Sequence, residues 1–135
     1  MKRLILIYII SLSSIFCNQV SIENVLTIAQ NAYAKYHPSN NRDNFAIRDI
    51  ESISDEDTPL FYICHLEPKG FILISAEDKT FPVLGYGFEN NFRTENMPSN
   101  LNYLFNLYKT EILSLRENND ILPPSIHEEW NSYLN

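Results

Sequence analysis

The residues best suited to chemistry in this sequence are two cysteines, three histidines and seventeen acidic side chains. Cys64 and His65 are the obvious candidates for a thiol nucleophile and its base, but they are adjacent in a strand-like run. Neighbouring residues of a strand point to opposite faces, so these two side chains cannot pair with each other. Cys64 is better interpreted as a small core residue. His37 and His127 stand far apart, in a loop and near the C-terminal end, so the sequence does not predict a thiol enzyme.

The carboxylates form no recognisable catalytic or metal-binding pattern. Residues 54–59 form an acidic turn that supplies too few clear oxygen ligands for a calcium site. Glu128 and Glu129 lie at the start of a predicted helix, where the helix dipole alone favours acidic side chains. No Gly-rich phosphate loop, GxSxG or HExxH motif occurs, and the histidines and cysteines have no metal-ligand spacing. We therefore predict a protein that is not an enzyme and that needs no metal or cofactor.

The first eighteen residues have the layout of a secretory signal peptide. Lys2 and Arg3 precede an apolar run over residues 4–10 and a serine-rich stretch over residues 11–14. The segment 4–17 is short for a membrane span of roughly 20 residues, although an uncleaved anchor is the alternative. We therefore assign residues 1–18 to a signal peptide, cleaved between residues 14 and 19, and residues 19–135 to a single domain. The expected location is secreted or periplasmic.

Cys17 offers a second interpretation of the N-terminal segment. A cysteine directly after such an apolar run can be the lipid-modified first residue of a bacterial lipoprotein, here an outer-membrane lipoprotein. Phe16 occupies the preceding position, where a small residue is usual. Contact with a membrane is expected only if Cys17 is lipidated. If cleavage removes Cys17, Cys64 is left alone and the domain has no internal disulfide.

The charge of the domain limits its partners. The full chain carries a net charge of −7, and removal of Lys2 and Arg3 leaves eight basic against 17 acidic side chains, a charge of −9. A domain this acidic is not expected to bind nucleic-acid phosphates or anionic lipid. We expect a soluble monomer that prefers neutral or basic partners.

The hydrophobic pattern predicts an α+β domain. A helix over residues 20–36 begins at Ser21, a favourable N-cap. Strands are predicted at residues 45–53, 60–66, 71–76 and 82–88; the third is apolar on both faces and should be central. A second helix over residues 99–117 and a short third helix opening with a capping box at Ser125 complete the chain. The expected fold is a small antiparallel sheet of about four strands, packed with an N-terminal and a C-terminal helix.

Four short motifs in order resemble a known family. The chain reads GFILISAED at residues 70–78, PVLGY at 82–86, NF at 91–92 and ENMP at 95–98, followed by an aromatic helix. This pattern resembles the pro-domain of the streptopain family of bacterial cysteine proteases and the free-standing streptopain-inhibitor proteins. The resemblance covers about residues 22–112. It implies an antiparallel sheet with helices and a streptopain-like cysteine protease as the partner.

The resemblance also implies a site. In that family the pro-domain blocks the protease with an asparagine that disturbs the catalytic histidine, and the matching residue here is Asn96. We therefore expect Asn96, Met97, Glu95 and Phe92 to bind the protease. The loop from Phe92 to Asn96 is about two residues shorter than in streptopain, and Lys69 replaces the second glycine of the family. From the residues alone, the alternative interpretation of Asn96 is a turn or helix-capping residue.

Three functions remain open at this point. No protease domain follows residue 135, so we expect a secreted stand-alone inhibitor of streptopain-like cysteine proteases, which blocks the active-site cleft with the loop before the second helix. The first alternative is a severed pro-domain that inhibits and aids folding of its own protease. The second alternative is a secreted or lipid-anchored binding module without a protease target.

Overall fold

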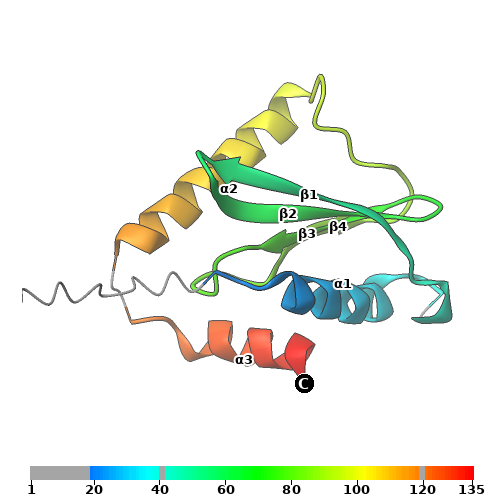
Figure 1. Cartoon of the computed structure of the whole chain (residues 1–135), viewed down its shortest axis with the longest axis horizontal. Coiled ribbons are helices and arrows are strands. Elements are labelled where there is room, and N and C mark those ends of the chain that lie inside the picture. The colour runs from blue at the N-terminus through cyan, green and yellow to red at the C-terminus, as the bar shows by residue number, and fades with distance from the viewer. Residues whose placement is uncertain (1–18, 40–41, 119–120) are drawn as a thin grey trace, which may run out of the picture.

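The computed structural model describes residues 19–39, 42–118 and 121–135, so the predicted signal peptide and Cys17 lie outside the described residues. The elements follow in the order α1 (Ile22–Tyr36), the 3-10 helix η1 (Arg42–Asn44), β1 (Ile47–Asp55), β2 (Thr58–Leu66), β3 (Phe71–Ser75), β4 (Val83–Gly87), α2 (Ser99–Glu117) and α3 (Pro124–Leu134) (Figure 1). None of the helices in this described part is long and apolar enough to cross a membrane. The predicted α+β class is confirmed.

The strands form one antiparallel sheet in the order β1-β2-β3-β4. Its interior strand β3 is buried on both faces, as its two-sided apolar pattern predicts. The prediction of an acidic turn over residues 54–59 is wrong at its edges, because Asp55 pairs with Thr58 and the strands continue into it. Glu56 makes this tight hairpin possible by adopting a positive φ of 51°.

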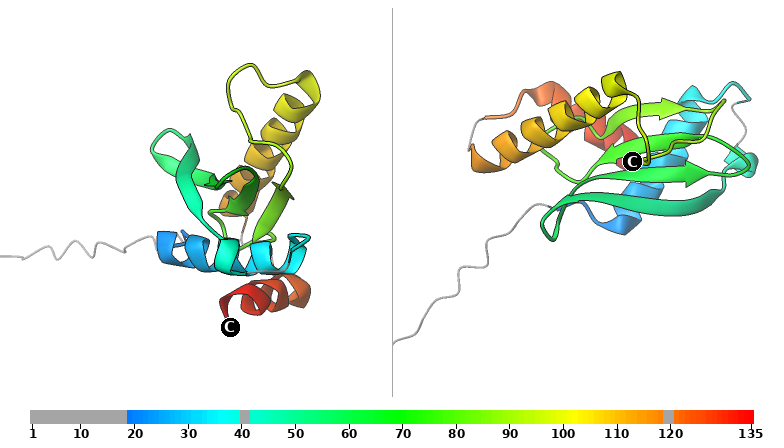
Figure 2. Two further views of the ribbon diagram at one scale, coloured as in Figure 1. Left: turned by 90° about the vertical axis from the view of Figure 1, so that its right-hand side faces the viewer. Right: turned by 90° about the horizontal axis from the view of Figure 1, so that it is seen from above.

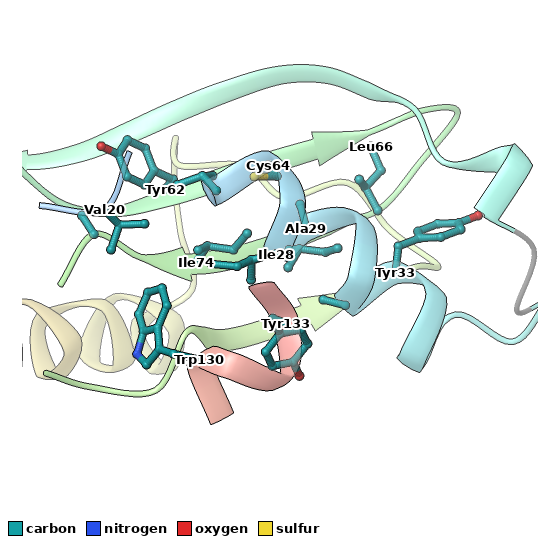
Figure 3. Close-up of a cluster of buried hydrophobic side chains, with 14 of the residues drawn as sticks. Val20, Ile28, Ala29, Tyr33, Tyr62, Cys64, Leu66, Ile74, Trp130 and Tyr133 are labelled. Carbon is teal, nitrogen blue, oxygen red and sulfur yellow. The ribbon is translucent and has the colours of Figure 1, made fainter. Parts of the chain in front are cut away.

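Helices cover both faces of the sheet. Helices α1 and α3 lie against one face and α2 runs obliquely over the other (Figures 1 and 2). Because successive strand residues alternate in direction, Cys64 packs toward α1 while Phe61 and Ile63 pack toward α2. The core on the α1 side is the larger of the two clusters, and Figure 3 shows it filled from both helices and the sheet.

The two helices on the first face begin and pack in different ways. Helix α1 begins as predicted, because the Ser21 hydroxyl accepts a hydrogen bond from the Asn24 backbone N–H at 3.2 Å. The predicted capping box at Ser125 is wrong, because α3 already begins at Pro124 and no side chain caps it. Proline is favoured at a first helical position because its ring fixes φ there. The indole N–H of Trp130 donates to the Thr80 carbonyl at 2.7 Å and fixes α3 to the loop after β3.

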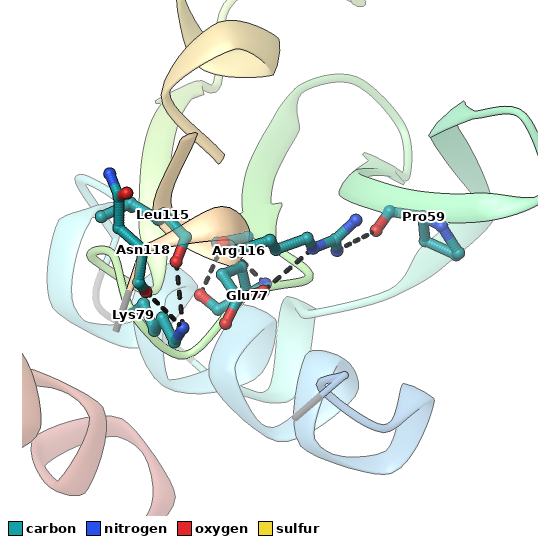
Figure 4. A network of polar contacts seen from close by, with 7 residues as sticks. Pro59, Glu77, Lys79, Leu115, Arg116 and Asn118 are labelled. Carbon is teal, nitrogen blue, oxygen red and sulfur yellow. Dashed lines mark hydrogen bonds and ion pairs between the residues drawn. The ribbon is translucent and has the colours of Figure 1, made fainter. Parts of the chain in front are cut away.

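A polar clamp holds the C-terminal end of α2 (Figure 4). Arg116 pairs with the buried carboxylate of Glu77 at 3.0 Å and donates to a carbonyl at the start of β2 at 2.6 Å. Lys79 donates to the carbonyls of Leu115 and Asn118 at 3.0 Å each, where the helix has no internal donors left. These contacts fix the C-terminal end of α2 to the sheet. The opposite, N-terminal end of the helix joins the loop that follows β4.

Candidate functional site

The loop between β4 and α2, residues 88–98, is tied to the sheet at its start. Phe88 is buried, and the next residue, Glu89, pairs with Lys69 at 2.9 Å on the surface. The Asn91 side-chain oxygen accepts a hydrogen bond from the Gly70 backbone N–H at 3.2 Å. The loop therefore leaves the sheet alongside the β2–β3 connection.

Phe92 is the hydrophobic anchor of this loop. Its ring lies 4.8 Å from the ring of Phe71 on β3, edge to face, and stacks at 5.2 Å on Phe105 of α2. Only 7% of Phe92 is exposed. An aromatic ring buried between two others at these distances contributes packing beyond its buried area. Phe92 therefore joins the sheet, the loop and α2.

Two glycines make this packing possible. Gly70 has a φ of 111°, and a Cβ there would lie 2.9 Å from the Gly87 carbonyl oxygen. A Cβ on Gly87 would lie 2.8 Å from the ring of Phe71. The separate sequence motifs at residues 70–78 and 91–92 therefore meet at one place. The backbone N–H of Gly70 in the first motif donates to the side chain of Asn91 in the second, and the rings of Phe71 and Phe92 are in contact.

The loop turns at Glu95 and Asn96, which are both exposed. Asn96 adopts the left-handed conformation with a φ of 54°, which asparagine tolerates better than most residues. No hydrogen bond joins its side-chain amide to another residue of the described chain. Met97 turns inward and packs against the core under α2, and Pro98 is the N-cap residue of that helix. Of the two roles open to Asn96, the turn is the one the structure adopts.

The comparisons with known proteins identify the family. The family model described as "Spi protease inhibitor" matches residues 17–112. The chain belongs to this family. The resemblance inferred from the sequence motifs is thereby confirmed, and the description of the family is that of a protease inhibitor.

A relative of this chain is a thiol protease. The chain is 28% identical over 92 residues to the thiol protease/hemagglutinin PrtT of Porphyromonas gingivalis. The match covers 66% of this chain and 11% of that protein, so the chain spans about a tenth of its relative's length. No solved structure matches the chain significantly.

The four residues predicted to bind a protease occupy two environments in the structure. Glu95 and Asn96 form the exposed apex, whereas Phe92 is buried in the core below it and the half-buried Met97 packs against that core. Beside the apex lies an open depression of about 480 Å³, whose lining includes Glu95, Asn96 and Leu101. Phe71 and Phe105, which hold the loop, were not among the predicted site residues. Only the aromatic character of the predicted third strand and second helix pointed to them.

The thiol of Cys64 and the imidazole of His65 are held in the core. Burial raises the pKa of Cys64 to about 12, which leaves its thiol protonated and unreactive at neutral pH. His65 is buried and its Nε2 lies 3.1 Å from a carboxylate oxygen of Glu51. No group of three or more His, Cys, Asp or Glu that could hold a metal ion occurs within residues 19–39, 42–118 and 121–135.

Proposed function

We propose that the protein inhibits thiol proteases of the streptopain family and that its apex, Glu95 and Asn96, enters the active-site cleft. One observation carries this proposal: Asn96 is exposed at a left-handed turn, between Phe92, which is buried in the core, and Met97, which packs against that core. The similarity to a thiol protease supports the choice of target, because the chain matches a short part of that protein, as a segment that binds the protease would.

The anchoring of the loop favours tight binding. A flexible loop loses conformational entropy when a partner orders it, at a cost of about 1–2 kcal/mol for each residue whose backbone is fixed. In this inhibitor the stacking of Phe92 and the Asn91–Gly70 hydrogen bond already fix the start of the loop. Met97 and helix α2 fix its end. The apex therefore reaches the protease in an ordered conformation.

The conformation at Asn96 also explains how the inhibitor would escape cleavage. A protease hydrolyses a peptide whose carbonyl is aligned with the nucleophile in a near-attack geometry. Backbone with a φ of 54° departs from the extended form of a substrate, so the carbonyl of Asn96 does not align in this way. Its neutral amide offers both donors and acceptors, which suits it to bond groups that the catalytic histidine would otherwise hold.

The four residues then have separate roles. Asn96 and Glu95 contact the protease, whereas Phe92 and Met97 act through the loop that they hold. The acidity of the chain suits a neutral or basic rim around the cleft. The basic and apolar residues 1–18 support export of the inhibitor to the compartment where secreted proteases act.

A second candidate is an inhibitory segment of a protease precursor. The observation that favours it is the match to a small part, 11%, of a much longer thiol protease. Such a segment would use the same apex, but it would inhibit in cis and assist folding of its own protease.

Protection of the catalytic cysteine tests whether the apex enters the cleft. A streptopain-like protease is treated with iodoacetamide, with and without the inhibitor, and alkylation of its cysteine is followed by mass spectrometry. Under the proposal, alkylation slows in proportion to the bound fraction. An unchanged alkylation rate in a complex that has formed would show that the apex lies elsewhere.

A further inference from the structure

The solvent-facing side of α2 differs from the rest of the inhibitor's surface. With 3.6 residues per turn, the side opposite the buried residues Phe105 and Ile112 carries, over the first three turns, Ser99, Tyr103, Asn106, Leu107 and Thr110. All five are exposed, and none is charged; the exposed Glu111 and Glu117 lie on this side farther along the helix. We call the surface over the first three turns, residues 99–110, the α2 outer face.

An uncharged outer face is unexpected in this chain. One residue in five of the sequence is charged and the net charge is −7, and the outer side of an amphipathic helix is where charged residues usually gather. Instead, 71% of Tyr103 and 49% of Leu107 are exposed here. Loss of charged residues combined with an exposed tyrosine and an aliphatic neighbour is typical of the centre of a protein–protein interface.

The α2 outer face continues from the proposed inhibitory apex. Helix α2 begins three residues after Asn96, and Figure 2 shows its N-terminal end and the loop together at one extremity of the molecule. At a rise of 1.5 Å per residue, Tyr103 and Leu107 lie about 6 and 12 Å along the axis from Ser99. A standard interface buries about 800 Å² on each partner, which is wide enough to cover both the apex and the first turns of α2.

We propose that the α2 outer face is a docking surface for the same thiol protease, beside its active-site cleft. This inference rests on the proposed function, because the protease that receives the apex is the partner that reaches the helix. The complementary surface on the protease is apolar and neutral, with hydrogen-bonding groups for Asn106 and Thr110. Tyr103 and Leu107 fill pockets there and provide most of the affinity of this surface. A lipid surface does not fit, because the outer face carries no basic side chain.

Alanine variants of Tyr103 and Leu107 test this docking surface, with Ile121→Ala as the matched control. Ile121 is 98% exposed and follows the opposite end of α2, so its removal also deletes an exposed apolar side chain. The dissociation constant of each variant for a streptopain-like protease is measured by biolayer interferometry. We expect Tyr103→Ala and Leu107→Ala each to weaken binding by about tenfold or more, and Ile121→Ala to change it by less than about twofold. Circular dichroism and thermal unfolding of each variant should match the wild type, because these side chains are exposed.

The outcomes separate this inference from the proposed function. If the wild type binds the protease and both α2 variants bind equally well, the docking surface is wrong and the proposed function stands. If the wild type does not bind such a protease, both proposals fail. Self-association of the wild type that Tyr103→Ala abolishes, without any effect on protease binding, would assign the outer face to a second copy of the chain and overturn the inference.

Discussion

Two substitutions at Asn96 separate the role of its backbone from the role of its amide. Asn96 has a φ of 54°, a conformation that costs most residues about 1–2 kcal/mol but that glycine adopts freely. Asn96→Gly therefore keeps the turn and should leave the free energy of unfolding within about 0.5 kcal/mol of the wild type. Asn96→Ala should lower it by about 1 kcal/mol, because alanine lacks the local hydrogen bonding that lets asparagine tolerate this region.

The effect on inhibition follows a different order. In the proposed complex both variants lose the amide, and the loss of a buried hydrogen-bonding side chain costs about 1–3 kcal/mol of binding free energy. That range corresponds to a rise of about 5- to 150-fold in the inhibition constant. Asn96→Gly should therefore inhibit poorly although it is as stable as the wild type. Asn96→Ala should inhibit at least as poorly.

Urea denaturation gives the stabilities, and a progress-curve assay with a fluorogenic substrate gives the inhibition constants. Asn96→Asp is the matched control, because aspartate shares the tolerance for this turn but replaces the neutral amide with a charge. Retention of wild-type inhibition by Asn96→Gly would refute the reasoning, since only the turn, and not the amide, would then matter.

Two further predictions concern the structure that supports the apex. Phe92→Ala removes a ring that is 7% exposed and stacked on Phe105, so it should lower the free energy of unfolding by about 3 kcal/mol and weaken inhibition, whereas Phe92→Leu should lose less of both; wild-type stability of Phe92→Ala in urea denaturation would contradict this packing. Burial, together with the neighbouring Glu77, raises the pKa of Asp78 above its ordinary value of 3.8 despite the opposing effect of Lys79. The folded state therefore holds this proton more tightly, so its contribution to stability is complete below pH 3.8 and is lost as the pH rises through the folded pKa. Asp78→Asn should remove this loss, so the change in unfolding temperature from pH 4 to pH 7 should be more favourable in the variant than in the wild type. Parallel plots of unfolding temperature against pH for the two proteins would contradict this prediction.

The elements of the fold could be predicted because local patterns determine them. The helix over residues 99–117 matches α2 in both bounds, and Ser21 caps α1 as expected. The two-sided apolar run in β3 predicted its interior place in the sheet. The ends of β1 and β2 were missed because a tight turn at Glu56 lets polar residues pair as strand, and polarity alone indicates a loop.

The environment of the candidate site residues depends on contacts that the local sequence does not contain. Phe92 stands in a polar loop, and it is buried only because Phe71 and Phe105 come from elements 21 residues before it and 13 residues after it. The turn role of Asn96 could be predicted from its residue type. The α2 outer face could not be predicted from the sequence, because exposure follows from which side of the helix faces the sheet.

Titration of a streptopain-like protease of known active-site concentration with the purified inhibitor tests the central claim most directly. Residual activity is measured after equilibration, and the inhibitor is then recovered and weighed by mass spectrometry. The account predicts a loss of activity that saturates at one inhibitor per protease, with the chain recovered uncut between Phe92 and Pro98. Full protease activity at micromolar inhibitor, or cleavage within this loop in step with recovery of activity, would contradict it.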